Sequence, residues 1–360
     1  ACKQNKSFLY LSGKNENAEQ LDEIAAVVPS KAASEYDAPF MMAIENAQLP
    51  NNSTHEACRI FHGRGRTYPG CEHLTLDWFP PVWVLTSFRE VHEQDLNRWG
   101  EALSKRSTSL SLPFNWVYQC RATTPTMTQL MLGSVPDPHM VTENGNFYLV
   151  HVLKGQNHGL FLDMARGRAY VQEHARDKNV LNLFAYTCAF SVAALQGGAS
   201  QVVNVDMSKG ALKIGQRNHE INDFGDTAGA ARFLGHNVFK TWGKIKKLGP
   251  YDMIVVDPPS YQKGSFVAEK DYKKLLRRLP SLLSSPVISG ANNADDDDGV
   301  GQVLLCLNAP ELDTDFLQSQ VVEEAPELEF VERLDNPCSF PAADPERTLK
   351  VLVYRLKTLL

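Results

Sequence analysis

The chain has 360 residues, of which 43% are hydrophobic and 22% charged, and its net charge is −6 at pH 7. These values are typical of a globular protein that is long enough for two domains. The net negative charge excludes a positively charged, nucleic-acid-binding surface over the whole molecule. We expect a cytoplasmic protein, because no apolar run could cross a bilayer and no charged-then-apolar leader is visible. The seven cysteines are scattered and never form C-x-x-C, so we expect neither a disulfide framework nor a bound metal.

The N-terminal part of the chain divides into a lead-in and a compact domain. Residues 1–57 are polar and acidic, and we expect a loosely attached segment of unknown role, with a short helix at Leu21–Val28. Residues 58–155 predict an α+β domain, in which several strands surround one amphipathic helix near 91–104. Asn144-Gly145 is a hairpin turn signal between two of these strands.

Basic and aromatic residues alternate at the start of this domain. We place them in a glycine-containing loop that precedes two strand-like runs. Basic groups beside a stacking aromatic suit RNA phosphates and unstacked bases, and a solvated hairpin loop is the alternative interpretation. The candidate RNA-binding residues are Arg59, His62, Arg64, Arg66 and Tyr68.

The stretch Val180–Asp206 predicts a strand, a tight loop, a helix and a second strand, which together form a parallel β-α-β crossover. Asp206 closes the second strand, where a carboxylate can bind a ribose diol. The loop lacks the G-x-G-x-x-G glycines that a pyrophosphate requires, which disfavours a nicotinamide dehydrogenase. It suits a ligand with a ribose and no phosphates, of which S-adenosylmethionine is the common example. An ordinary α/β core is the alternative.

A buried strand at 251–257 ends in Asp257, and Pro258 and Pro259 follow it directly. Two prolines remove N–H donors, which leaves carbonyls and one carboxylate to face the crevice at the edge of the sheet. Asp257 and the Pro258 carbonyl would hold the exocyclic amine of a nucleobase, and Tyr261 or Phe266 would stack on the base. If a ring nitrogen is the acceptor, Asp257 only orients the base. An ordinary strand end before a surface loop is the alternative.

Five short segments of the C-terminal half carry a family pattern: Gly159–Asp163, Asn182–Thr187, Gly197–Ala199, Val205–Ser208 and Asp257–Ser260. In combination they resemble the class I S-adenosylmethionine-dependent methyltransferases of the RlmI/RlmK kind, which modify large-subunit ribosomal RNA. The resemblance covers roughly residues 140–360. It implies an α/β fold with a Rossmann-like sheet of seven strands, the last pair antiparallel, within a methyltransferase domain at 156–360. The smaller α+β domain resembles the family's central domain, and no PUA-type RNA-binding domain is recognisable.

The resemblance also implies roles for individual residues. Phe184, Ala185, Tyr186 and Thr187 would line the methionine end of the cofactor. Asp206 would bind the ribose hydroxyls, Asn237 would approach the adenine amino group, and Asp257 would face the transferred methyl. The remaining cofactor-binding candidates are Phe161, Asp163, Met207 and Val238, and the catalytic candidates are Asp257, Pro258, Tyr261 and Asn308. The chain departs from the family at Cys188, where a glycine is usual, and at Asn237, where aspartate is common.

The residue after the fifth strand of the implied sheet decides the type of reaction. Cytosine C5 methylation needs a cysteine that adds to C6, and by the resemblance Asn308 takes that position. Cys306 falls inside the strand, so we favour a base nitrogen of ribosomal RNA as the acceptor. Three alternatives stay open: 5-methylcytosine formation through Cys306 or Cys338, a protein or small-molecule substrate, and a protein that binds the cofactor without turnover. RNA is the expected partner, a homodimer stays open, and the acidic run at 292–299 predicts a surface loop rather than a metal site.

Overall fold

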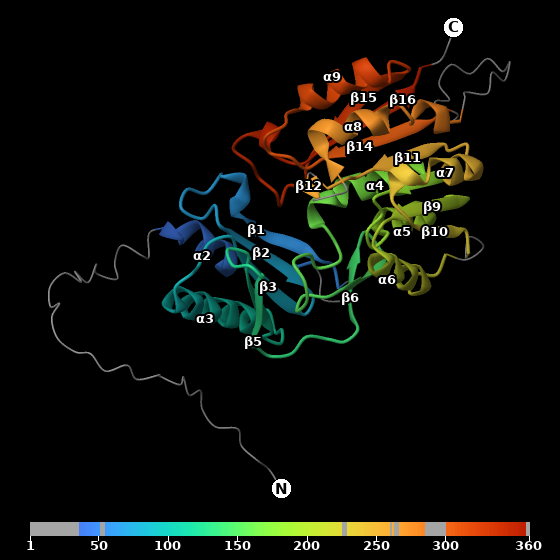
Figure 1. The fold of residues 1–360 in the computed structure, drawn as a ribbon. Coiled ribbons are helices and arrows are strands. Elements are labelled where there is room, and N and C mark those ends of the chain that lie inside the picture. Colours follow the sequence, from blue (N-terminus) through green and yellow to red (C-terminus); the bar gives the residue numbers. More distant parts are fainter. Residues whose placement is uncertain are drawn as a thin grey trace, which may run out of the picture.

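The computed structural model describes residues 36–50, 55–224, 229–259, 261–262, 266–284 and 300–357, and only the backbone at 261–262. A five-stranded sheet organises the N-terminal half and a seven-stranded sheet the C-terminal half (Figure 1). The helix expected at Leu21–Val28 and the acidic loop at 292–299 lie outside the described residues. Across these described ranges, no helix combines the length and apolarity needed to span a membrane.

The smaller sheet has its strands in sequence order: β1 (Cys58–His62), β2 (Leu74–Phe79), β3 (Val82–Ser87), β4 (Trp116–Cys120) and β5 (Met127–Leu132). Neighbours are antiparallel except β3 and β4, which are parallel and are connected through helix α3 (Glu93–Ser109). Helix α3 buries Trp99 and Leu103 against one face of the sheet.

Helix α2 (Ala38–Glu45) lies within the segment that we expected to be loosely attached. Its Phe40 and Ile44 are fully buried in the same core as α3 and the five-stranded sheet. The two side chains are four residues apart and therefore project from one face of the helix. This part of the lead-in expectation is wrong, because α2 is an integral element of the smaller domain.

The β-hairpin β6 (His139–Glu143) and β7 (Asn146–Val150) joins the two halves of the molecule. Both turn residues, Asn144 and Gly145, have positive φ, at 49° and 78°, as the predicted turn requires. Val141, Tyr148 and Val150 pack in one cluster with residues of β2 to β4 and with Val192 of the larger domain. The two sheets are therefore connected through a shared hydrophobic core.

The larger sheet has the order β10-β9-β8-β11-β14-β16-β15. Strands β8 to β11 and β14 are parallel, and β16 is antiparallel to both β14 and β15, which confirms the predicted sheet of seven strands with an antiparallel closing pair. Strand β8 lies between β9 and β11, so the strand order reverses there and opens a crevice at the carboxyl edge. The bounds are β8 (Asn179–Leu183), β9 (Gln201–Asp206), β10 (Ala231–Gly235), β11 (Met253–Val256), β14 (Gln302–Leu307), β15 (Leu328–Leu334) and β16 (Lys350–Leu356).

Helices cover both faces of this sheet because successive residues of its buried strands point to opposite sides. Val180 belongs to a core with α4 and α5, and Leu181 to a core with α7, α8 and α9. The helices are α4 (Ala165–His174), α5 (Ala189–Gln196), α6 (Lys209–Glu220), α7 (Trp242–Leu248), α8 (Ala268–Leu276) and α9 (Thr314–Glu324). A short hairpin, β12 (Tyr261–Gln262) with β13 (Phe266–Val267), follows the Pro-Pro segment.

Candidate active site

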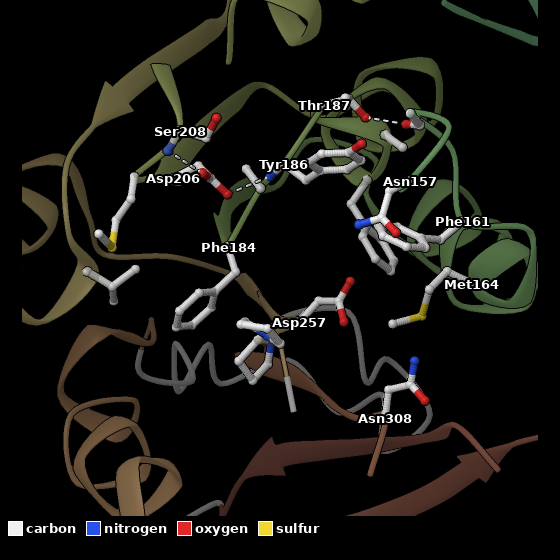
Figure 2. Close-up of a pocket in the computed structure, with 18 of the residues that line it drawn as sticks. Asn157, Phe161, Met164, Phe184, Tyr186, Thr187, Asp206, Ser208, Asp257 and Asn308 are labelled. Carbon is white, nitrogen blue, oxygen red and sulfur yellow. Dashed lines mark hydrogen bonds between the residues drawn. The ribbon is translucent and has the colours of Figure 1, made fainter. Parts of the chain in front are cut away.

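A cavity of about 460 Å³ opens at the carboxyl edge of β8, β9 and β11 (Figure 2). Its volume is within the roughly 300–1,000 Å³ of small-ligand sites. Pro258 and Asn308 of the catalytic group line it, whereas the Tyr261 side chain lies outside the described part of the structure. Every residue predicted to hold the cofactor lines it as well: Phe161, Asp163, Phe184, Ala185, Tyr186, Thr187, Asp206, Met207, Asn237, Val238 and Asp257.

The loop between β8 and α5 has an unusual backbone. Phe184, Tyr186 and Cys188 have φ values of 58°, 47° and 62°, although none is glycine. Short hydrogen bonds hold the loop: the Cys188 N–H donates to the Ala185 carbonyl at 2.7 Å, and Thr187 Oγ1 donates to the Gly159 carbonyl at 2.6 Å. Position 188 is left-handed, a conformation that glycine adopts without strain, which is a physical reason for a glycine there.

The Cys188 side chain does not line the cavity. It is fully buried and packs with Ala185 and Leu212 at the interface with α6. A Cβ atom on Gly215 of α6 would approach the Cys188 sulfur to 2.4 Å, so the contact is tight. Burial raises the pKa of the thiol well above its usual value. The thiol therefore does not fill the space beside Tyr186 and Thr187 where a ligand would lie.

Asp206 is held in one orientation by the backbone. Its Oδ2 accepts from the Tyr186 N–H at 2.8 Å and its Oδ1 from the Ser208 N–H at 2.7 Å (Figure 2). A carboxylate has about four lone-pair positions, so both oxygens can still accept from a diol. Ser208 also caps α6, since its Oγ accepts from the Ala211 N–H at 3.2 Å.

Asn237 is likewise fixed by a cap. Its Oδ1 accepts from the Phe239 N–H at 2.9 Å, at the start of a 3₁₀ turn (Val238–Lys240). The side-chain NH₂ is close to the Met207 sulfur, at 3.4 Å, and is the group that Asn237 offers to the cavity. A donor of this kind suits a ring nitrogen better than an amino group.

Asp257 projects into the cavity from the end of β11 (Figure 2). Burial raises the pKa of its carboxyl to about 7, and the negative charge of Asp163 adds to the rise while Arg168 opposes it. Burial also raises the pKa of Asp163. A carboxyl that titrates near neutral pH can exchange a proton with a bound molecule.

Arg168 is a lining residue that the sequence interpretation missed. It lies on α4 and forms a buried ion pair with Glu143 of β6. No local pattern in the sequence indicates this role, because its partner Glu143 lies 25 residues earlier in the chain. Asn157 and Met164, which flank the Gly159–Asp163 segment, also line the cavity and were missed.

Asn308 and Cys306 differ in their position along β14, because Asn308 lies just beyond the carboxyl end of the strand and Cys306 lies inside it. Asn308 follows β14 and reaches the cavity (Figure 2), whereas Cys306 is fully buried in the core with α4 and α5. Burial raises the pKa of the Cys306 thiol well above its usual value. Among the described residues, no cysteine lines this cavity.

Phe266 does not serve as a stacking platform, and that expectation is wrong. Its side chain is 1% exposed. It packs edge-on against Phe184, with ring centroids 5.4 Å apart, and parallel to Phe239 at 6.4 Å. Three aromatic rings from distant segments thus form the wall behind the cavity.

The placement of the basic stretch in one loop is also wrong in part. Arg59 and His62 lie in β1, because the segment pairs with β2 and places Arg59 opposite Asp77. The Arg59 guanidinium forms an ion pair with Asp77 and hydrogen-bonds His62 Nδ1 at 2.6 Å. Arg66 is exposed, and Tyr68 packs on Phe61. Arg59, His62 and Arg64 line a second cavity of about 340 Å³.

A parallel sheet with an antiparallel closing pair, and a carboxylate placed for a ribose at its switch point, define a Rossmann-like methyltransferase. The family model described as S-adenosylmethionine-dependent methyltransferase matches residues 58–355. The chain therefore belongs to this family, and its cofactor is S-adenosylmethionine.

Curated relatives share part of the chain. A protein of Tolumonas auensis named ribosomal RNA large subunit methyltransferase I is 32% identical over 229 residues, which are 61% of this chain and 53% of that protein. One of the same name from Aeromonas salmonicida is 38% identical over 138 residues, 37% of this chain and 34% of that one. A Psychrobacter protein named ribosomal RNA large subunit methyltransferase K/L is 34% identical over 161 residues, 43% of this chain and 20% of that one. The matches thus span about half of these relatives' length or less.

Solved structures share the fold. A chain from Streptococcus mutans, described as an S-adenosylmethionine-dependent methyltransferase, superimposes with a TM-score of 0.73 at 22% identity, over 90% of this chain and 81% of that one. A methyltransferase complexed with SAH gives a TM-score of 0.69 at 22% identity, over 90% and 79%. The fold thus extends over both domains.

Proposed function

We propose that the protein transfers a methyl group from S-adenosylmethionine to a base nitrogen of RNA, with large-subunit ribosomal RNA as its substrate. The observation that carries this proposal is the meeting of Asp257 and Asn308 in one cavity with Asp206. The Asp257 carboxyl would face the transferred methyl group, and among the described residues no cysteine lines the same cavity. The names of the relatives support ribosomal RNA as the substrate class.

The cofactor would lie along the carboxyl edge of the sheet. Asp206 would accept hydrogen bonds from both ribose hydroxyls, and the NH₂ of Asn237 would meet a ring nitrogen of the adenine. The loop at 184–187 would hold the methionine end. S-adenosylmethionine supplies an electrophilic methyl group and leaves as S-adenosylhomocysteine, and the SAH complex of a structural neighbour supports this use of the fold.

Asp257 would hold the acceptor. Its carboxylate and the Pro258 carbonyl would accept the hydrogens of an exocyclic amine, which directs the nitrogen lone pair at the methyl carbon. A pKa of about 7 lets Asp257 take up the proton that the methylated nitrogen releases. With a ring nitrogen as the acceptor, no proton leaves and Asp257 acts as an orienting group.

The domain organisation fits this proposal. The five-stranded sheet and α2 would contribute to RNA binding, and the unit from about residue 156 would carry the chemistry. Arg64 and Arg66 remain candidate phosphate contacts, since both side chains are exposed.

The test is transfer of tritiated methyl groups to total RNA from cells that lack the protein, followed by mapping of the modified nucleotide. We expect label on a base nitrogen of large-subunit ribosomal RNA. Asp257→Ala should abolish transfer while calorimetry shows nearly unchanged cofactor affinity. Label on protein or small molecules alone, or at cytosine C5, contradicts the proposal, as does cofactor binding without any transfer.

A further inference from the structure

The second cavity lies between the two domains, beside the cofactor cavity. Its volume is about 340 Å³. Strands β1 to β3 form one wall, and the loop 335–349 that precedes β16 forms the other. The Ala343 N–H donates to the Gly65 carbonyl at 2.9 Å, which joins these walls. Both cavities share the lining residues Asn157, Phe161, Asp163 and Asn308.

A buried polar side chain in this cavity lacks a well-formed hydrogen bond. His158 is 7% exposed, and neither ring nitrogen makes a hydrogen bond of normal geometry. Burial and the nearby positive charge of Arg121 lower its pKa to about 3, against an opposing effect of the His151 backbone, so the ring is neutral at pH 7. A neutral imidazole offers one donor and one acceptor, and leaving both unsatisfied in a buried site is unfavourable. A ligand with an acceptor and a donor on one edge, such as a nucleobase, would satisfy both.

The cavity also has flat, cationic surfaces for stacking. The Arg64 guanidinium lies over the Phe88 ring at 4.0 Å, and the Arg59 guanidinium over the Phe340 ring at 4.6 Å. Bases that leave their stack are held in proteins between aromatic rings and guanidinium planes. Phe88 and Phe340 therefore fix the guanidinium groups in orientations suited to a base.

The charge of the cavity is opposite to that of the whole chain. Its arginines are Arg59, Arg64, Arg121 and Arg347, and its carboxylates are Asp77 and Asp163. Arg59 is neutralised by Asp77, but Arg64 and Arg347 are exposed and have no carboxylate partner among the described residues. The chain as a whole carries −6. This local excess of positive charge at an exposed rim suits a phosphate.

We propose that this cavity receives the target nucleotide, with the base inserted against His158, its phosphate at Arg64 and Arg347, and its reactive edge at the shared wall next to Asp257. This inference rests on the proposed RNA methyltransferase function. It names the site of the substrate, and it requires a base that is unpaired or turned out of its helix.

The experiment uses the full chain saturated with S-adenosylhomocysteine and titrated with each of the four nucleoside 5′-monophosphates. The NMR signals of the histidine rings show whether a base contacts His158. Isothermal calorimetry measures whether the affinity for S-adenosylhomocysteine is unchanged. We expect one monophosphate to shift the His158 signals, and Arg64→Glu with Arg347→Glu to weaken this binding at least about tenfold. The matched control Arg89→Glu changes an exposed arginine beside Phe88 that lines neither cavity.

Methyl transfer to RNA provides the second measurement. His158→Leu should lower kcat/KM for RNA about tenfold or more without altering cofactor affinity, and His158→Gln, which keeps a donor and an acceptor, should recover part of the loss. His73→Leu, at a half-buried histidine outside both cavities, is the control for folding. If His158→Leu and the double arginine variant both methylate RNA as the wild type does, the second cavity does not bind the target nucleotide, and the proposed methyltransferase function is unaffected. If the wild-type protein binds a monophosphate but methylates no RNA, the result supports nucleotide binding in the second cavity and contradicts the proposed RNA methyltransferase function.

Discussion

Arg168 of α4 donates two hydrogen bonds to Glu143 of β6, from Nε to Oε1 at 2.5 Å and from Nη2 to Oε2 at 2.7 Å. The same Nη2 donates to the Phe161 carbonyl at 2.7 Å. Both side chains are almost fully buried. One guanidinium group thus fastens the hairpin that joins the domains to the segment that lines both cavities.

Removing one partner of this pair should destabilise the fold. Arg168→Met leaves the Glu143 carboxylate buried without its partner, for which we expect a loss of about 3–5 kcal/mol in the free energy of unfolding, measured in urea. Arg168→Met combined with Glu143→Leu should recover much of the loss. The control Lys273→Met breaks the surface pair with Glu323, whose side chains are 35% and 59% exposed, and should cost less than about 1 kcal/mol. Equal losses in the single and double variants would show that the charge is not the cause.

The Asp257 carboxyl should give both stability and activity a pH dependence. Its pKa rises from 3.8 to about 7 in the folded protein, so between these values the folded state holds more protons than the unfolded state. Its contribution therefore lowers stability as pH rises through this window and is constant above it. Asp257→Asn should remove this slope in urea unfolding.

Methyl transfer should follow the opposite course, because the ionised carboxylate is the better acceptor, and should increase with pH around 7. Asp163→Asn removes a neighbouring negative charge, which should lower the pKa of Asp257 and move the activity profile to lower pH. A wild-type rate that is flat from about pH 6 to 8 when chemistry limits turnover contradicts the assignment.

The contact between Cys188 and Gly215 offers a double-mutant cycle. Gly215→Ala would place a Cβ at 2.4 Å from the Cys188 sulfur and should destabilise the protein by about 1–3 kcal/mol. Cys188→Gly removes the sulfur and also suits the left-handed backbone at that position, so the double variant should be more stable than Gly215→Ala. Thermal unfolding measures the stabilities, and additive losses would contradict the contact. Cofactor affinity should stay unchanged in Cys188→Gly.

Asp206→Ala should weaken the binding of S-adenosylmethionine by at least about tenfold, because each hydrogen bond to a charged group contributes roughly 1.5–3 kcal/mol. Isothermal calorimetry on the full chain gives the affinity. Asp313→Ala is the control: it also removes a carboxylate that accepts from a backbone N–H, at the start of α9, and Asp313 does not line the cavity. Equal affinity in Asp206→Ala and wild type would refute a ribose contact.

Local patterns in the sequence were sufficient for the strands and the cofactor cavity of the larger domain. The buried strands, the carboxylate at Asp206 and the Pro-Pro segment each lie within a few residues of the feature that they predict, and the structure brings them to one cavity. The resemblance extended this to the closing antiparallel pair. By contrast, β5 and α7 were not predicted, since β5 is an edge strand whose exposed apolar residues give no alternation.

The failures concern partners that are distant in the sequence. Arg59 is a strand residue because Asp77 lies opposite it, and Phe266 is buried because Phe184 and Phe239 enclose it. Hydrophobicity alone does not distinguish a ring in the core from a ring that faces a ligand. His158 and Arg168 were overlooked for the same reason, because their environment comes from strands of the other domain and from the β6–β7 hairpin.

The segment Asn157–Asp163 couples ligand binding in the two cavities. Since it lines both cavities, any rearrangement that one ligand induces in it changes the shape of the other cavity. Such coupling is reciprocal: the factor by which the cofactor alters affinity for the proposed RNA substrate equals the factor by which that substrate alters affinity for the cofactor. After transfer, the loss of the sulfonium charge beside Asp163 and Asp257 would act on both affinities through this common wall, which links release of the methylated nucleotide to release of the spent cofactor.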